Sequence, residues 1–286
     1  MKWIFTSVFL LLTSYLFCQL PDGDIWLFDI KDSAGKILTR NGENITNRKG
    51  YDNQPAFSPD GKYILFSSQR DSTGTTDIYR YDLTTKKTTR FTKTPASEYS
   101  PTFSPDGKYV SVVMVEKDSA QRLWKFPLAG GSPECIMKTV DSIGYFYWIN
   151  KDSVAVHVLT KPAFTLQIAN IHTQKAKIIA DSIGRCMRMH NGNLWYTTSS
   201  GHFNNVFEYS FKSKTSLLKG VIESEDYCFR GTNEIWSCSD NTIVSGYMSS
   251  KEGADEIVNF SSYGLAKITR IAISPDGKKL AVVSNK

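Results

Sequence analysis

The sequence contains none of the short motifs that mark the commonest catalytic and cofactor sites. It has no G-x-S-x-G nucleophile elbow, no H-E-x-x-H or C-x-x-C pair, no P-loop and no G-x-G-x-x-G dinucleotide fingerprint. The four histidines follow no metal-ligand spacing: His157, His172, His190 and His202. These absences argue against an enzyme with a recognisable site, and we expect neither a cofactor nor a metal.

Long apolar runs are equally scarce. The longest apolar stretch covers residues 4–17 and follows a short start that contains Lys2. It is too short for a comfortable membrane span. A positive start before such a run is typical of a secretory signal peptide. We therefore expect a signal peptide over residues 1–18, a protein in the periplasm or outside the cell, and no membrane span. A lipid anchor at Cys18 is the alternative interpretation.

Cysteine is too rare for a disulfide scaffold, with five in 286 residues. Without Cys18, four would remain: Cys135, Cys186, Cys228 and Cys238. Cys228 and Cys238 lie symmetrically about residue 233 in an expected hairpin, and export permits disulfides. The sequence leaves two interpretations open: a disulfide between Cys228 and Cys238, or a pair of buried free thiols.

Charge and composition point to an ordinary folded chain. The formal net charge is +6, but the basic residues are scattered and do not form a nucleic-acid-binding patch. Aromatic residues make up 13% of the chain, which suits pleated β-structure. No linker or composition break divides the chain, so we expect one domain over residues 19–286, a monomer, and no nucleic-acid partner.

A repeat organises the chain after its first residues. The words SPDGK stand between two apolar runs at residues 55–68, 101–114 and 271–284, and three weaker copies lie between. Pro presets the turn, Asp caps it and Gly takes the positive φ, so each copy predicts a β-hairpin. Equivalent positions are 46, 45, 41, 40 and 44 residues apart: Phe57, Phe103, Trp148, Met189, Phe229 and Ile273. This period is that of a four-stranded propeller blade.

A second alternating pattern follows each hairpin, as in Asp77-Ile-Tyr-Arg-Tyr-Asp-Leu83. The same pattern near residue 24 begins the chain after the expected signal peptide, whereas the hairpin at residues 271–284 ends it. Six complete blades therefore require the two ends to share one blade. We expect an all-β, six-bladed propeller of four-stranded antiparallel blades, closed by pairing of the N-terminal strands with the C-terminal hairpin.

At SPDGK, followed by an apolar strand and then D-I-Y-R-Y-D-L, the chain resembles the TolB-type, WD40-like propeller repeat called PD40. The resemblance implies a rigid ring whose channel mouth receives a peptide or a partner protein. Some related propellers are lyases that act on oligogalacturonate and hold a metal with a histidine cluster. The fold alone does not choose between these tasks.

The loops just before the inner strands should converge on the central opening, where binding is common. Their residues lean acidic, which would attract a basic or polar segment of a partner. The candidate binding residues are Asp52, Asn53, Glu98, Tyr99, Tyr145, Arg185, Glu225, Asp226 and Arg270. The SPDGK aspartates are expected to build turns only.

We therefore expect an exported, non-enzymatic scaffold that binds a protein or peptide of the cell envelope at its channel mouth. Two alternatives stay open: a propeller enzyme, a lyase or hydrolase, acting on carbohydrate in the channel, and a structural accessory of the envelope.

Overall fold

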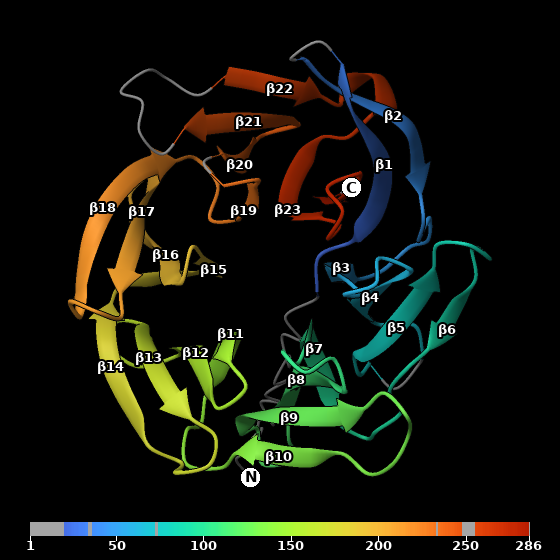
Figure 1. Cartoon of the computed structure of the whole chain (residues 1–286). Helices are drawn as coiled ribbons and strands as arrows, with labels where there is room; N and C mark the ends of the chain where they lie inside the picture. The colour runs from blue at the N-terminus through green and yellow to red at the C-terminus, as the bar shows by residue number, and fades with distance from the viewer. Residues whose placement is uncertain (1–19, 34–35, 72–73, 233, 248–254, 286) are drawn as a thin grey trace, which may run out of the picture.

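The chain forms a ring of six β-sheets around a central opening in a computed structural model (Figure 1). The structure describes residues 20–285 apart from 34–35, 72–73, 233 and 248–254; the expected signal peptide and Cys18 lie outside the described residues. Each sheet has four antiparallel strands, as predicted. In the described part, the one helical element is the 3-10 turn η1 (Ser261–Tyr263).

The six blades are numbered in chain order, and each is given from its inner strand to its outer strand. Blade 1 comprises β3 (Asp52–Phe57), β4 (Tyr63–Ser68), β5 (Asp77–Asp82) and β6 (Thr88–Arg90). Blade 2 comprises β7 (Ser97–Phe103), β8 (Tyr109–Val115), β9 (Gln121–Pro127) and β10 (Glu134–Met137). Blade 3 comprises β11 (Ile143–Asn150), β12 (Ser153–Val158), β13 (Thr165–Asn170) and β14 (Ala176–Asp181).

The second half of the ring follows the same order. Blade 4 comprises β15 (Ile183–His190), β16 (Asn193–Ser200), β17 (Phe203–Ser210) and β18 (Thr215–Ile222). Blade 5 comprises β19 (Tyr227–Arg230), β20 (Glu234–Ser239), β21 (Thr242–Tyr247) and β22 (Asp255–Asn259). Blade 6 comprises β23 (Lys267–Ile273), β24 (Lys279–Asn285), β1 (Gly23–Ser33) and β2 (Lys36–Asn44).

Blade 6 closes the ring with strands from both ends of the chain. Its strand order is β2-β1-β24-β23, and β1 pairs with β24 over seven consecutive residue pairs from Gly23↔Asn285 to Asp29↔Lys279. Figure 1 shows the blue N-terminal strands beside the red C-terminal hairpin. The closure predicted by counting half-blades is confirmed. It pairs strand edges that an open ring would leave unpaired.

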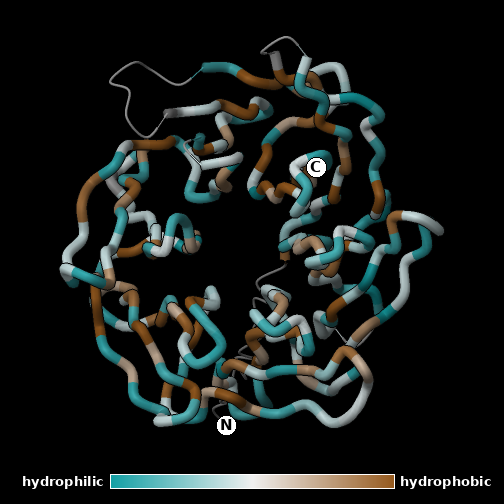
Figure 2. The backbone as a smooth tube through the Cα atoms, viewed as in Figure 1, coloured by the Kyte–Doolittle hydropathy of each residue, from teal (hydrophilic) through white to brown (hydrophobic). Residues whose placement is uncertain are grey.

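The apolar core is divided among the six blade interfaces. Each of the six clusters of buried apolar side chains draws on two neighbouring blades. Successive strand residues point to opposite faces of a sheet, so one strand serves two interfaces. In β24, Leu280 and Val282 pack toward blade 5, whereas Ala281 and Val283 pack toward blade 1. Hydrophobic stretches are accordingly spread around the ring in Figure 2 and leave the centre open.

The SPDGK words build the turns between the first two strands of their blades. In blade 1 the Ser58 hydroxyl donates to Asp60 Oδ1 at 2.7 Å and accepts from the Tyr63 amide, while Gly61 has a φ of 68°. The hydrogen bonds that Asp60 accepts from Ser58 and from the Lys62 amide lower the pKa of its carboxyl group. The serine–aspartate bond recurs at Asp106 and Asp276. All three aspartates are committed to the turn, as expected.

Cys228 and Cys238 are free, buried thiols, so the disulfide that their spacing allowed is not formed. The reason is the register of the β19–β20 hairpin. Arg230 pairs with Glu234, which centres the hairpin on residue 232 and places Cys228 opposite Trp236. The two cysteines are therefore offset along the hairpin. Both belong to the cluster between blades 5 and 6.

Alkylation of the native protein should modify Cys135 slowly and leave Cys186, Cys228 and Cys238 unmodified. Cys135 is half-buried and the other three are buried, and burial raises the pKa of all four thiols. Because the thiolate is the reactive form, all four should react fully only in denaturant. Mass spectrometry without reductant checks this. A two-dalton mass deficit with two unreactive cysteines in denaturant would reveal a disulfide after all.

Candidate functional site

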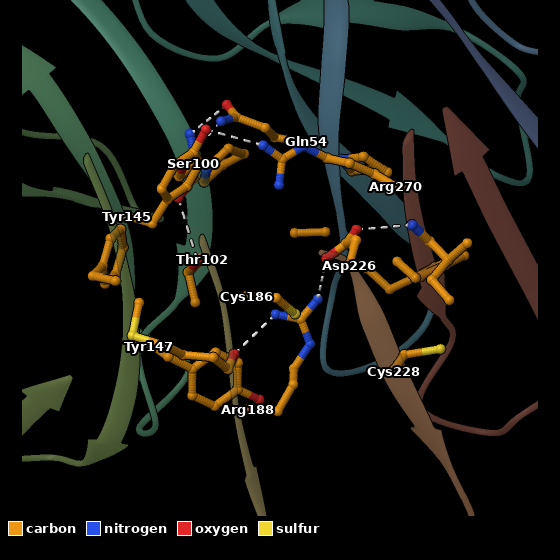
Figure 3. A pocket seen from close by; sticks show the side chains of 18 of the residues that line it. Gln54, Ser100, Thr102, Tyr145, Tyr147, Cys186, Arg188, Asp226, Cys228 and Arg270 are labelled. Carbon is orange, nitrogen blue, oxygen red and sulfur yellow. Dashed lines mark hydrogen bonds and ion pairs between the residues drawn. The ribbon is translucent and has the colours of Figure 1, made fainter. Parts of the chain in front are cut away.

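The six inner strands enclose a central channel with a cavity of about 440 Å³ (Figure 3). Its lining comes in two layers, because alternate residues of a strand face the same side. The layer nearer the start of the inner strands consists of Gln54, Ser100, Tyr145, Cys186, Asp226 and Arg270. The next layer consists of Ala56, Thr102, Tyr147, Arg188, Cys228 and Ala272. The end of the channel beside the first layer is called the mouth.

A β-bulge at the start of most inner strands turns the first-layer side chains into the channel. In five blades the pairing of the inner strand with the second strand is shifted close to this layer. In blades 1 and 2, Gln54 and Ser100 take positive φ angles of 59° and 56°. Pro55 and Pro101 follow them and have no N–H to donate to a ladder. Such a bulge re-aims a side chain without ending the strand.

Gln54 and Ser100 join blades 1 and 2 in the first layer. The Gln54 amide nitrogen donates to Ser100 Oγ at 3.0 Å, and the Ser100 backbone amide donates to Gln54 Oε1 at 2.8 Å. Ser67 donates to the same oxygen. The amide is thus held in place, and this part of the wall is neutral.

Asp226 and Arg188 form a partly buried ion pair on the opposite wall. Arg188 Nη2 lies 3.4 Å from Asp226 Oδ1, and the Ile271 amide donates to Asp226 Oδ2 at 3.0 Å. The Asp226 side chain is 3% exposed. Arg188 also donates to the Met187 carbonyl and lies over the Tyr147 ring. Asp226 therefore ties blade 4 to blade 6 through blade 5.

Two further arginines reach across the mouth. Arg270 of blade 6 donates to Tyr145 Oη of blade 3 at 3.3 Å, and its guanidinium lies over the Tyr145 ring. Arg185 of blade 4 donates to the Thr269 carbonyl of blade 6 at 2.9 Å, and its Nη1 is 3.5 Å from Glu225. Arg185 Nε is buried and has no hydrogen-bond partner among the described residues. Each guanidinium carries five N–H donors, so both arginines keep donors for a ligand.

The channel is positively charged, which corrects the expectation of an acidic mouth. Among the described residues, its lining holds three arginines, Arg185, Arg188 and Arg270, against one carboxylate, Asp226. The expectation was wrong because two of the four counted carboxylates are folded into the protein and a third lies beside the channel. A cationic channel favours an anionic ligand.

Four of the nine candidate residues line the channel: Tyr145, Arg185, Asp226 and Arg270. The other five lie outside the channel lining: Asp52, Asn53, Glu98, Tyr99 and Glu225. Asn53 is buried and accepts from the Gln54 amide, and Tyr99 accepts from Thr76 Oγ1 while its ring meets Tyr51 edge-on. Both fix the local backbone.

Asp52 is fully buried and anchors the loops at the start of blade 1. Arg48 Nη1 lies 3.0 Å from Asp52 Oδ2, Arg70 Nη2 lies 3.4 Å from Oδ1, and Ser68 donates to Oδ1. Burial raises the pKa of Asp52, although Ser68 and the two arginines oppose the shift. Asp52 is thus a structural carboxylate.

Glu98 is likewise a structural carboxylate, at the start of blade 2. Its side chain has no exposed surface and accepts hydrogen bonds from Thr92 Oγ1 at 3.0 Å and from Thr94 Oγ1. Burial raises the pKa of Glu98 to about 7, and the nearby Asp77 carboxylate adds to the rise. The native state therefore holds this proton more tightly than the unfolded chain does.

The Glu98 contribution to the free energy of unfolding should be full below about pH 4.5 and lost as the pH rises through about 7. One pKa unit corresponds to about 1.4 kcal/mol, so the loss should be about 3 kcal/mol. Glu98→Gln should flatten the fall in stability between pH 5 and pH 8 (denaturation at about ten pH values). Glu134→Gln, which changes a 65% exposed carboxylate, is the control. Parallel pH profiles for wild type and Glu98→Gln would contradict the assignment.

Sequence reasoning missed Gln54, Ser100, Tyr147 and Arg188 as lining residues. The two-residue period could have found the last two: Tyr147 follows Tyr145 by two positions, and Arg188 follows Cys186 by two. The repeat spacing could have found the first two: Gln54 and Ser100 stand at the repeat position that Tyr145 and Arg270 occupy in their blades.

In the part of the chain that the structure describes, no group of three His, Cys, Asp or Glu side chains is close enough to hold a metal ion. No helix in the described ranges is long and apolar enough to cross a membrane.

The fold and the channel define the class of protein, a six-bladed β-propeller with four-stranded blades and an arginine-rich central channel. The family description "PD40: TolB beta propeller domain" matches residues 26–187, more than half of the chain. The chain belongs to the TolB beta-propeller family.

Individual relatives are more distant. The Tol-Pal system protein TolB of Francisella tularensis subsp. mediasiatica is 32% identical over 77 residues, which span 27% of this chain and 17% of that protein. A solved TolB candidate from Agrobacterium tumefaciens has a TM-score of 0.67 at 14% identity and covers 93% of this chain and 99% of its own. The oligogalacturonate lyase of Vibrio parahaemolyticus has a TM-score of 0.53 at 12% identity, covering 92% and 98%. The two structures share the fold alone.

Proposed function

We propose that this chain is an exported, non-enzymatic binding scaffold that takes an acidic segment of a protein or peptide at the mouth of its channel. The observation that carries the proposal is the pair Arg185 and Arg270, which reach across the mouth and whose contacts there use only some of their guanidinium N–H donors. A guanidinium binds a carboxylate through two parallel hydrogen bonds, and enclosure strengthens that pairing.

The setting is the cell envelope. The apolar run that predicts a signal peptide over residues 1–18 and the short match to a Tol-Pal system protein support it. The mature protein would lie in the periplasm or outside the cell, with lipidation at Cys18 as the alternative. Mass spectrometry of the mature N-terminus distinguishes these.

The same arginines could bind the carboxylates of a uronate oligosaccharide, so a lyase acting in the channel is the second candidate. The one carboxylate in the described lining, Asp226, is held by Arg188 and the Ile271 amide, which makes it a poor general base for such a reaction. Incubation of the protein with oligogalacturonate is the simplest experiment that distinguishes a lyase from a binding scaffold. Formation of unsaturated products with turnover would favour the lyase.

Capture from envelope extract tests the proposal directly. The immobilised mature chain should retain a partner that the Arg185→Gln/Arg270→Gln double variant loses, because the variant removes two of three cationic groups in the channel. Lys62→Gln/Lys86→Gln is the matched control, since it removes two charges from side chains that are 73% and 63% exposed. Equal retention by both double variants would rule out the channel as the binding site.

A further inference from the structure

A second cavity opens beside the channel mouth, between blades 3 and 4. It has a volume of about 640 Å³, and we call it the side pocket. The loop from β12 to β13 supplies its apolar wall: Leu159, Pro162, Ala163 and Phe164. Phe164 is 47% exposed and Leu159 is 36% exposed, so two large apolar side chains line an open cavity.

His157 forms the floor of the side pocket. It is 3% exposed, and its ring lies 5.0 Å from the Phe164 ring and 5.6 Å from the Tyr145 ring, centroid to centroid. Burial lowers the pKa of His157 to about 4, so the floor is uncharged at neutral pH. Gly144 makes room for this ring, since a Cβ there would lie 3.0 Å from His157 Nδ1. An uncharged aromatic floor and an apolar wall suit an apolar side chain.

The side pocket and the channel share two wall residues, Tyr145 and Arg185. Tyr145 presents its hydroxyl to Arg270 on the channel side, and its ring meets the His157 ring at an interplanar angle of 77° on the pocket side. The cationic site and the apolar site are therefore neighbours along one continuous surface. A single extended chain, which advances about 3.4 Å per residue, can reach both within a few residues.

We propose that the side pocket is a second subsite for the same partner segment, and that this segment is an extended peptide carrying an apolar side chain within a few residues of its acidic group. This inference rests on the proposed function of the channel. The acidic group lies against Arg270 and Arg185, and the apolar side chain packs on the exposed faces of Phe164 and Leu159. The apolar contact supplies affinity, and the charged contact fixes the register of the peptide.

Selection from a displayed library of random dodecapeptides tests the inference, followed by fluorescence anisotropy with synthetic copies of the enriched peptides. An enriched peptide should hold one acidic and one apolar residue at a constant spacing. Replacing either should weaken binding about tenfold. The acidic replacement should have little further effect in Arg270→Gln, and the apolar replacement little further effect in Phe164→Ser, as in a double-mutant cycle.

Two more variants make the test specific. Ala163→Glu places a charge in the side pocket on an accessible loop and should weaken binding as Phe164→Ser does. Leu217→Ser removes a 64% exposed apolar side chain on the outer strand of blade 4 and should bind as wild type. Melting curves verify the fold of each variant.

The outcomes separate the two proposals. Peptides that need Arg270 but bind Phe164→Ser and Ala163→Glu as tightly as wild type would contradict the side-pocket proposal. The proposed function of the channel would still hold. Failure of any peptide to enrich on wild type over the Arg185→Gln/Arg270→Gln variant would overturn both.

Discussion

A chain that ends at Ala266 is expected to lose cooperative folding altogether. This truncation removes β23 and β24, and with them Ile268, Ile271, Leu280, Val282 and Val283, all at most 3% exposed. Each such side chain contributes about 2 kcal/mol on burial, so the loss is on the order of 10 kcal/mol. That equals the whole stability of an ordinary domain. Circular dichroism should show no melting transition at temperatures where the full chain is folded.

A circular permutant is the matched control, because it keeps every strand. It would begin at Lys267 and join residue 285 to Gly23 through a short turn, which the pairing Gly23↔Asn285 permits. Blade 6 would then be one continuous meander, β23-β24-β1-β2, and should melt near the wild-type temperature. An Ala266 truncation with unchanged melting would contradict the closure, whereas an unfolded permutant would show that the chain order itself is needed.

The fold could be predicted from the sequence because its determinants are local and repeated. The turn at Ser58–Gly61 is fixed by its own hydrogen bonds and by one positive φ, and the same residues recur at Ser104 and Ser274. The closure followed from counting half-blades, since a ring with an open edge is unfavourable. The Cys228–Cys238 spacing left a disulfide and free thiols both open, because it does not fix the hairpin register: Cys228 pairs with Trp236, two residues before Cys238.

The sequence could predict where on the fold the site lies, but not which side chains form it. The loops before the inner strands do lead to the channel, but local spacing does not tell whether a carboxylate faces the channel or the protein. Glu98 turns inward to Thr92 and Thr94, whereas Asp226 reaches the channel lining. The contacts that shape the mouth join residues far apart in sequence, such as Arg270 with Tyr145, and only the closed ring brings them together.

Replacing Asp226 with Asn should weaken the fold and strengthen the binding of acidic peptides. Breaking a buried ion pair by removing one partner costs about 3 to 5 kcal/mol. Because Arg188 is 27% exposed and Asn can still accept from the Ile271 amide, we expect about 2 to 3 kcal/mol and a melting temperature lower by about 5 °C or more. Loss of the one carboxylate in the described lining raises the net positive charge of the channel by one, so affinity should rise about fivefold.

The opposite signs of these two effects make the prediction specific. A residue that merely holds the channel together would lower both stability and affinity when replaced, and an uninvolved residue would change neither. Glu225→Gln removes the adjacent carboxylate, which is 40% exposed and paired with Arg185, and should change stability by less than about 1 kcal/mol. Thermal melting and fluorescence anisotropy on the same preparations measure both quantities. A less stable Asp226→Asn that binds acidic peptides more weakly would show that the Arg188–Asp226 pair shapes the site, and that the net charge of the channel does not set its affinity.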